Sequence, residues 1–182
     1  MHIRSTLAAL LMAATALPAL AANPMVGGAA MFEAKNIVEN AVNSADHTTL
    51  VAAVQAAGLV ETLMTPGPFT VFAPVNAAFD ALPAGTVETL LKPENKAMLT
   101  KVLTAHVVPG KLNVADLARR AKKDKKGFVH LQTVSGDALS VQVKGANLFV
   151  FSESRNIGRI TIADVNQSNG VIHVVDTVLV PK

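Results

Sequence analysis

The stretch Phe69–Leu82, FTVFAPVNAAFDAL, decides how the rest of this sequence is interpreted. Its first five residues, Phe69–Ala73, have the β-branched and aromatic character of a strand. Pro74 should end that strand, because proline has no N–H to donate to a neighbouring strand. Asn76 then predicts the N-cap of a short helix that carries Phe79 on its apolar face. The stretch offers little for catalysis, so we interpret it as structural scaffold.

The composition indicates one folded domain and excludes several kinds of site. Of the 182 residues, 51% are hydrophobic and 16% are charged, which argues against a disordered chain. The sequence contains no Cys, so it has no disulfide, no thiolate metal ligand and no cysteine nucleophile. It also lacks Trp and Tyr, two of the aromatic residues that stack on bases. We therefore expect no nucleic-acid partner.

The N-terminus has the pattern of a secretory signal peptide. Arg4 supplies positive charge, the apolar run Leu7–Leu20 follows, and Ala19–Ala21 is a small-x-small cleavage site. The apolar run is shorter than the roughly 20 residues that a membrane-spanning helix needs. We predict a signal peptide over residues 1–21 and no transmembrane span after cleavage. The mature protein is then expected to be secreted, with a periplasmic, cell-surface or extracellular location.

Beyond the cleavage site the sequence divides into two parts. Residues 22–35 include Gly27 and Gly28, show no hydrophobic period and predict a flexible lead-in. The domain is predicted to span residues 36–182, with helical spacing in its first half and period-two alternation from Phe128 onward. Helices followed by antiparallel strands indicate an α+β fold.

The last predicted strand, Val171–Val180, carries the most informative polar residue. Both faces of this strand are mostly apolar, so Asp176 is expected to be buried among aliphatic side chains. An unpaired carboxylate there would be strongly unfavourable, which requires hydrogen-bond partners. We predict that Asp176 accepts from backbone N–H groups, or from Thr70 or His106, and so ties the last strand to the first half of the domain.

Three segments in this order resemble the motifs of the fasciclin domain family. They are FTVFAPVNAAF from Phe69, LTAHVV over Leu103–Val108 and GVIHVVDTVL over Gly170–Leu179. They are similar to the first conserved box, the central tyrosine-histidine box and the second conserved box of that family. The resemblance covers roughly residues 36–182 and assigns structural motif positions to eight residues: Thr70, Phe72, Pro74, Asn76, Phe79, His106, His173 and Asp176.

The resemblance implies a wedge-shaped β-sandwich packed against a layer of helices. It also implies a secreted or cell-surface protein that takes part in adhesion or in matrix or polysaccharide binding without being an enzyme. Ala105 stands where many relatives have a tyrosine that belongs to the segment credited with integrin recognition. Integrin binding is therefore not carried over to this chain.

The five histidines do not predict a metal or catalytic site. No HxH or HxxxH spacing is present, and no Gly-x-Ser-x-Gly motif accompanies them. We expect no catalytic residue, no metal and no cofactor. His106 and His173 are interpreted as structural imidazoles that are hydrogen-bonded across the fold.

Positive charge is concentrated between residues 119 and 126, which we call the basic segment. It contains a single acid, Asp124, and six cations: Arg119, Arg120, Lys122, Lys123, Lys125 and Lys126. Outside this segment and Arg4, nine Lys or Arg stand against twelve Asp or Glu, so the positive excess is local. Two interpretations stay open. The segment is either a site for an anionic partner such as acidic polysaccharide, or a solvated helix end whose cations favour the helix C-terminus.

The sequence supports two main functions. The first is a non-enzymatic adhesion or binding module of the cell surface, extracellular matrix or cell envelope, with a polysaccharide or protein partner. The alternative is an envelope protein that binds a small apolar ligand or stabilises a membrane-protein partner, which the aliphatic-rich composition suggests. An exported hydrolase is disfavoured because the sequence has no catalytic constellation.

Overall fold

Helices fill the first half of the chain and hairpin-connected strands the second, as the sequence predicts. The computed structural model describes residues 23–182, so the predicted signal peptide lies outside the described residues. The helices are α1 (Ile37–Ala41), α2 (Thr48–Ala57), α3 (Val60–Met64), α4 (Asn76–Asp80), α5 (Thr86–Leu90), α6 (Lys96–Thr104) and α7 (Val114–Ala121), with 3-10 turns η1 (Ala45–His47) and η2 (Pro93–Asn95). The strands are β1 (Met25–Val26), β2 (Ala29–Ala30), β3 (Phe69–Pro74), β4 (Val107–Pro109), β5 (Phe128–Gln132), β6 (Ala138–Lys144), β7 (Asn147–Ser152), β8 (Ile157–Gln167) and β9 (Gly170–Val175). The fold is α+β.

Seven strands form one bent sheet in the order β4-β3-β9-β8-β7-β6-β5. Neighbouring strands are antiparallel except β3 and β9, which run parallel from Phe69 opposite Gly170 to Pro74 opposite Val175. Gly170 permits this close approach, because a Cβ at that position would collide with the Phe69 carbonyl. The sequence predicts both strands but not their parallel pairing.

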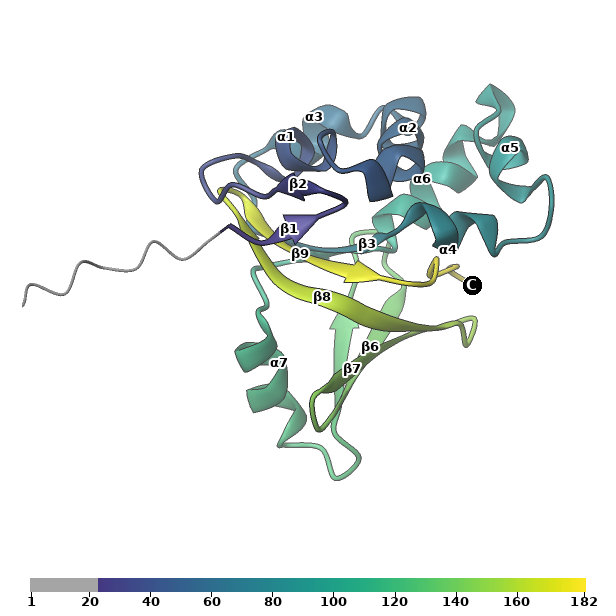
Figure 1. Ribbon diagram of the computed structural model, residues 1–182. Helices are drawn as coiled ribbons and strands as arrows, with labels where there is room; N and C mark the ends of the chain where they lie inside the picture. Colours follow the sequence, from purple (N-terminus) through teal and green to yellow (C-terminus); the bar gives the residue numbers. More distant parts are fainter. Residues whose placement is uncertain (1–22) are drawn as a thin grey trace, which may run out of the picture.

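The bend gives the sheet the shape of a wedge. Strands β3, β9 and β8 form one wall, and β5, β6 and β7 form the other (Figure 1). The pairing of β8 with β9 is irregular between Ile160 and Val165, as is common where a strand bends. At one end the walls meet, since the Val134 N–H donates to the Val107 carbonyl (2.8 Å) and joins the β5–β6 loop to β4. This is the wedge-shaped sandwich that the resemblance implies.

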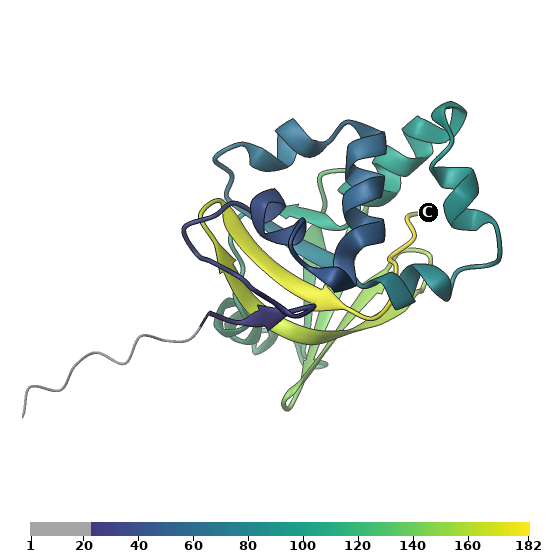
Figure 2. The same ribbon diagram turned by 45° about the horizontal axis from the view of Figure 1, so that its top comes forward.

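Two hydrophobic cores lie on opposite faces of the wall formed by β3 and β9. Val71 and Ala73 of β3 belong to the first core, beneath the helices, whereas Phe72 belongs to the second, inside the wedge. Helices α1 to α6 make a layer over the first core (Figure 2). The second core is closed by α7, whose Leu117 is fully buried.

The segment expected to be a flexible lead-in is instead part of the domain. Strands β1 and β2 form an antiparallel hairpin, and Val26 and Met31 are buried in the first core. The Lys35 carbonyl accepts from the Ser168 N–H (2.9 Å), which ties the segment to the β8–β9 loop. The expectation was wrong because strands of two residues leave no hydrophobic period for a sequence pattern to detect.

The sequence predicts Asn76 as the N-cap of its own helix, but the structure shows a different role. The N-cap of α4 is Val75, so Asn76 is the first residue inside the helix. Its Oδ1 accepts from the Thr49 N–H (3.0 Å) in the first turn of α2, and its Nδ2 donates to the Ala45 carbonyl (2.8 Å). Asn76 therefore stabilises the start of a different helix and ties α4 to α2.

Candidate functional site

The basic segment occupies the C-terminal end of α7 and the loop that leads into β5. Arg119 and Arg120 lie in the last turn of α7, and the four lysines follow in the loop. All six cationic side chains are exposed. Leu117 and Ala121 hold the opposite face of α7 against β5 and β6, so the cations are directed away from the core. The segment is thus an accessible surface on a fixed support.

The charges around α7 follow the helix dipole. At its N-terminus Asn113 accepts from the Asp116 N–H (2.8 Å) and Asp164 Oδ1 accepts from the Val114 N–H (2.7 Å). Negative groups thus lie at the positive end of the helix and arginines at its negative end, which stabilises the helix. This arrangement favours the interpretation that Arg119 and Arg120 serve to stabilise the helix end. The loop lysines lie beyond the helix, so the same argument does not explain them.

The loop after α7 is ordered by its single acid. Asp124 Oδ1 accepts from the Lys126 N–H (2.6 Å), and this hydrogen bond is the main cause that lowers the pKa of Asp124. Arg119 pairs with Asp116, whereas the other five cations of the basic segment form no ion pair within residues 23–182. A group of unpaired, exposed cations on an ordered loop is chemically suited to anionic ligands.

Lys144 extends the basic surface, and sequence reasoning missed it. It is exposed at the end of β6, next to Val143, whose N–H donates to the Gly127 carbonyl (3.0 Å) at the end of the loop. The sequence alone shows that Lys144 is a cation but not that it lies near the basic segment. Only the β5–β6 register places residue 144 beside residue 126. The basic segment lies on an exposed helix end and loop, and its role as a site for an anionic partner stays a prediction.

Among the motif residues, Thr70, Phe72 and His173 come together on β3 and β9. Thr70 Oγ1 donates to the Gly110 carbonyl (2.6 Å) and accepts from the Leu112 N–H (2.9 Å). His173 Nε2–H donates to the Leu112 carbonyl (2.8 Å), and its ring stacks on Phe72 with centroids 5.7 Å apart. These side chains hold the connection between β4 and α7. Burial lowers the pKa of His173 and favours the neutral ring.

His106 holds the C-terminal segment. Its Nδ1–H donates to the Val102 carbonyl (2.8 Å) and its Nε2 accepts from the Leu179 N–H (2.9 Å). The ring is buried, which lowers the pKa of His106 to about 4 and keeps it neutral at physiological pH. With both nitrogens engaged, this geometry agrees with the expected structural imidazole.

Asp176 is not buried, contrary to the expectation from the two apolar faces. Strand β9 ends at Val175, one residue earlier, and the Asp176 side chain is exposed. Its Oδ1 accepts from the Arg159 N–H (2.8 Å) and from Thr177 Oγ1 (3.1 Å). The predicted backbone N–H partner exists, but it belongs to β8, so Asp176 ties two neighbouring strands rather than the two halves of the domain.

The remaining motif residues, Pro74 and Phe79, are parts of the scaffold. Pro74 is the last residue of β3, so its missing N–H does not interrupt the hydrogen bonds that the rest of the strand makes with β9. Phe79 is buried in the first core from α4. Neither side chain presents a chemical group to solvent.

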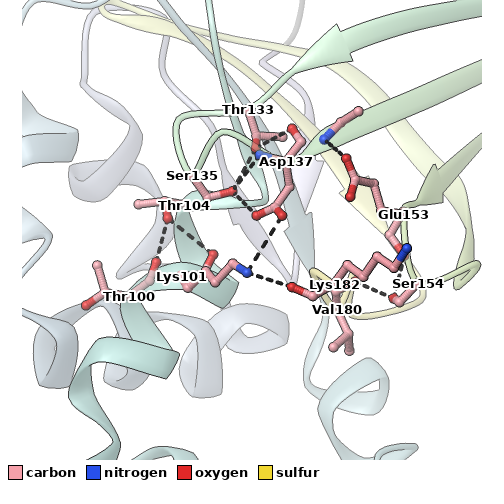
Figure 3. A network of polar contacts seen from close by, with 12 residues as sticks. Thr100, Lys101, Thr104, Thr133, Ser135, Asp137, Glu153, Ser154, Val180 and Lys182 are labelled. Atoms are coloured by element: carbon pink, nitrogen blue, oxygen red, sulfur yellow. Dashed lines mark hydrogen bonds and ion pairs between the residues drawn. The ribbon is translucent and has the colours of Figure 1, made fainter.

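A polar network joins α6, the β5–β6 loop and the C-terminus (Figure 3). Ser135 Oγ donates to Asp137 Oδ2 (2.6 Å), while Lys101 Nζ lies 3.8 Å from Asp137 Oδ1 and donates to the Lys182 carbonyl oxygen (2.6 Å). Within the described residues no histidine is hydrogen-bonded to Ser135. Ser135, Asp137 and Lys101 thus hold the β5–β6 loop against α6 and the C-terminal residue.

Residues 23–182 contain no group of three His, Asp or Glu side chains that could hold a metal ion. No helix in the same part of the chain has the length and hydropathy of a membrane-spanning segment.

Comparison with known proteins shows similarity to other proteins over most of this chain. A family profile described as Fasciclin domain matches residues 45–181. Protein sll1483 of Synechocystis is 50% identical over 157 residues, which are 86% of this chain and 79% of that protein. The cell surface glycolipoprotein MPB83 of Mycobacterium bovis is 37% identical over 123 residues, which are 68% of this chain and 48% of that protein.

A solved structure has the same fold. The FAS1 domain pair from the insect cell adhesion molecule fasciclin I superposes with a TM-score of 0.68 at 18% identity, over 80% of this chain. The chain spans about half the length of that domain pair, since 50% of it is covered. At this level of identity the similarity establishes the fold alone.

Proposed function

This chain belongs to the fasciclin domain family, and from that membership we propose that it is a non-enzymatic adhesion module of the cell surface, cell envelope or extracellular space. The structural neighbour is named as part of a cell adhesion molecule, and one relative is named a cell surface protein. The N-terminal pattern of a signal peptide supports an exported location. The polar clusters described for residues 23–182 support no catalytic role.

The partner that fits best is an acidic polysaccharide at a cell surface or in a matrix. The observation that carries this choice is the loop of the basic segment, whose lysines are exposed and unpaired within the described residues. Sulfate and carboxylate groups repeated along a polymer contact several such cations at once, so the attraction adds over the segment. Lys144 enlarges the same surface.

Integrin recognition is not part of the proposal. Ala105, which stands at the position of the family tyrosine, is 2% exposed at the end of α6. A methyl group buried there offers a partner neither contact area nor a hydrogen bond.

The proposal is tested with dextran sulfate and uncharged dextran on the purified protein. We expect binding to dextran sulfate only, with an affinity that falls as NaCl rises, because salt screens exposed charges. Replacement of three of the four loop lysines, Lys122, Lys123 and Lys125, by Ala should weaken binding about tenfold or more, since each contact to an anion contributes on the order of 0.5–1 kcal/mol.

A matched variant separates local recognition from net charge. Replacing three exposed lysines elsewhere, Lys92, Lys96 and Lys111, by Ala removes the same charge and should leave binding within about twofold of the wild type. Equal losses in both triple variants would mean that net charge, and not the basic segment, attracts the polymer. Binding to dextran as well would contradict an ionic site.

A further inference from the structure

An apolar cavity of about 110 Å³ lies between the helical layer and the sheet. Its lining residues come mainly from α1, α2 and α3 on one side and from β3 and β9 on the other. Aliphatic side chains make up most of its wall, among them Leu50, Val54, Val60, Leu63, Val71 and Ile172. Within residues 23–182, no Asp, Glu, Lys or Arg lines it. The cavity is on the opposite side of β3 and β9 from α7 and the basic segment.

One polar side chain in this wall has an unused hydrogen-bonding atom. His47, at the end of η1, lines the cavity and is only 3% exposed. Its Nδ1 is bonded to Ser44 Oγ (2.9 Å), but among the described residues its Nε2 is the one buried side-chain nitrogen or oxygen without a hydrogen-bond partner. The buried rings of His106 and His173 use both nitrogens, so His47 is exceptional in this fold.

Burial decides the charge of this ring. Desolvation lowers the pKa of His47, while the Ala73 carbonyl and Asp46 offset part of that effect. The Ala73 carbonyl is near enough to favour the charged ring but makes no hydrogen bond with Nε2. A neutral imidazole therefore offers one donor or one acceptor to the cavity, depending on the tautomer that Ser44 selects.

Water is a poor occupant for this space. A buried water needs two to four polar partners, and apolar cavities without them stay dry. Besides His47, five polar residues of the described chain line the cavity: Ser44, Gln55, Thr62, Thr104 and His106. Ser44 is already bonded to Nδ1, Thr104 Oγ1 donates to the Thr100 carbonyl (2.7 Å), and both nitrogens of His106 are engaged. Gln55 and Thr62 are exposed residues. A water on Nε2 would leave most of its own hydrogen bonds unmade.

We propose that this cavity binds a small uncharged molecule of about the size of benzene that carries a single hydroxyl group, with its ring or short chain among the aliphatic side chains and its hydroxyl bonded to His47 Nε2. The size follows from the volume, since an engineered apolar cavity of about 150 Å³ binds benzene. The neutrality of the ligand follows from the wall, to which the described part of the chain contributes no charged side chain that could pair with an ion. The hydroxyl group of the ligand is inferred from the unpaired Nε2 of His47, because a hydroxyl can either donate a hydrogen bond to that atom or accept one from it.

The test compares phenol with benzene on the purified protein. We expect both to shift the methyl NMR signals of Leu50 and Val54 in a saturable way, with phenol binding several-fold more tightly. Only phenol should shift the 15N signal of His47 Nε2. This measurement on the wild-type protein does not depend on any variant being folded.

Two variants assign the preference to His47. His47→Phe keeps a ring of similar shape but removes Nε2, so the advantage of phenol over benzene should fall about threefold to tenfold, the equivalent of one hydrogen bond. His130 has the same kind of contact, Nδ1 to Ser140 Oγ (2.8 Å), but is exposed on β5, so His130→Phe should change neither affinity.

Three results would overturn the proposal. The first is that neither molecule shifts the cavity methyl groups. The second is that phenol and benzene bind equally well to the wild type. The third is that phenol binds without changing the His47 Nε2 signal, which would place its hydroxyl elsewhere. None of these results bears on the dextran sulfate experiment, so this inference and the adhesion proposal fail independently.

Discussion

Single buried polar side chains hold the irregular segments of this fold in place. Thr70 and His173 bind backbone groups between Gly110 and Leu112, and His106 binds the Leu179 N–H. Neither segment belongs to a strand or helix, so its backbone groups have no partner from regular structure. The motif residues therefore supply the hydrogen bonds that secondary structure does not, and this explains their polar character in a hydrophobic interior.

Replacing Thr70 by Val should test this role with little change in shape. The variant leaves the buried Leu112 N–H without an acceptor and the Gly110 carbonyl without a donor, so we expect a loss of about 2 kcal/mol in the free energy of unfolding. Urea denaturation followed by circular dichroism measures the loss. Thr100→Val on the surface of α6 removes only a hydroxyl bonded to the Lys96 carbonyl and should cost less than about 0.5 kcal/mol. Equal midpoints for Thr70→Val and wild type would refute the role.

Asn169 shows which residues sequence patterns do not reveal. It is 4% exposed, its Oδ1 accepts from the Ile37 N–H (3.0 Å), and its Nδ2 donates to the carbonyls of Leu63 (2.7 Å) and Thr65 (2.9 Å). The sequence places it in an ordinary loop before the last strand. Its partners lie more than 100 positions away, as the separation of 132 for Ile37 records, so no local pattern carries this signal.

At the scale of secondary structure, the β1–β2 hairpin decides whether the domain begins near residue 36 or earlier. Met31, directly after β2, is 2% exposed in the first core, whereas Met25 of β1 is 58% exposed. Met31→Ala should destabilise the protein by about 2–5 kcal/mol through lost burial and the cavity that remains. Met25→Ala, in the same hairpin, should leave the thermal midpoint nearly unchanged. A similar midpoint for both variants would mean that the hairpin contributes little to the core.

Elements with a strong local signal could be predicted, and their long-range partners could not. Asn36 and Asn113 cap α1 and α7 because their side chains act within three residues, as the bonds to the Glu39 and Asp116 N–H groups show. The alternation in β5, β6 and β7 likewise follows from hairpin pairing. The parallel pairing of β3 with β9 and the contact of Asn76 with α2 join residues far apart in the sequence, and no local pattern determines them.

The same limit applies to the candidate sites. The basic segment is visible in the sequence because its six cations fall within eight residues. The cavity beside His47 is not visible, because it arises from residues of α1, α2, α3, β3 and β9 that meet only in the folded chain. The apolar run Val171–Val180 predicts a buried Asp176, but β9 ends at Val175 and the Asp176 side chain is exposed.

For the molecule as a whole, histidines buried on both faces of the β3–β9 wall set the response to acid. His47 borders the first core, while His173 stacks on Phe72 in the second. Burial lowers the pKa of His47, His106 and His173 from the ordinary value of 6.5, to about 4 for His106. In the unfolded chain these rings accept protons near pH 6.5, whereas the folded protein resists protonation.

The free energy of unfolding should therefore be largest above pH 6.5 and fall as the pH drops towards 4, because the unfolded state then binds more protons than the folded state. Each such histidine contributes a slope of up to about 1.4 kcal/mol per pH unit. Urea denaturation at pH 7, 6 and 5 measures the slope in a range where most carboxylates remain ionised. His106→Gln, which keeps a donor and an acceptor, should reduce the slope, while His130→Gln at an exposed site should not. A free energy of unfolding that is equal at pH 7 and pH 5 would show that these histidines take up as many protons in the folded as in the unfolded state, which would contradict their lowered pKa values.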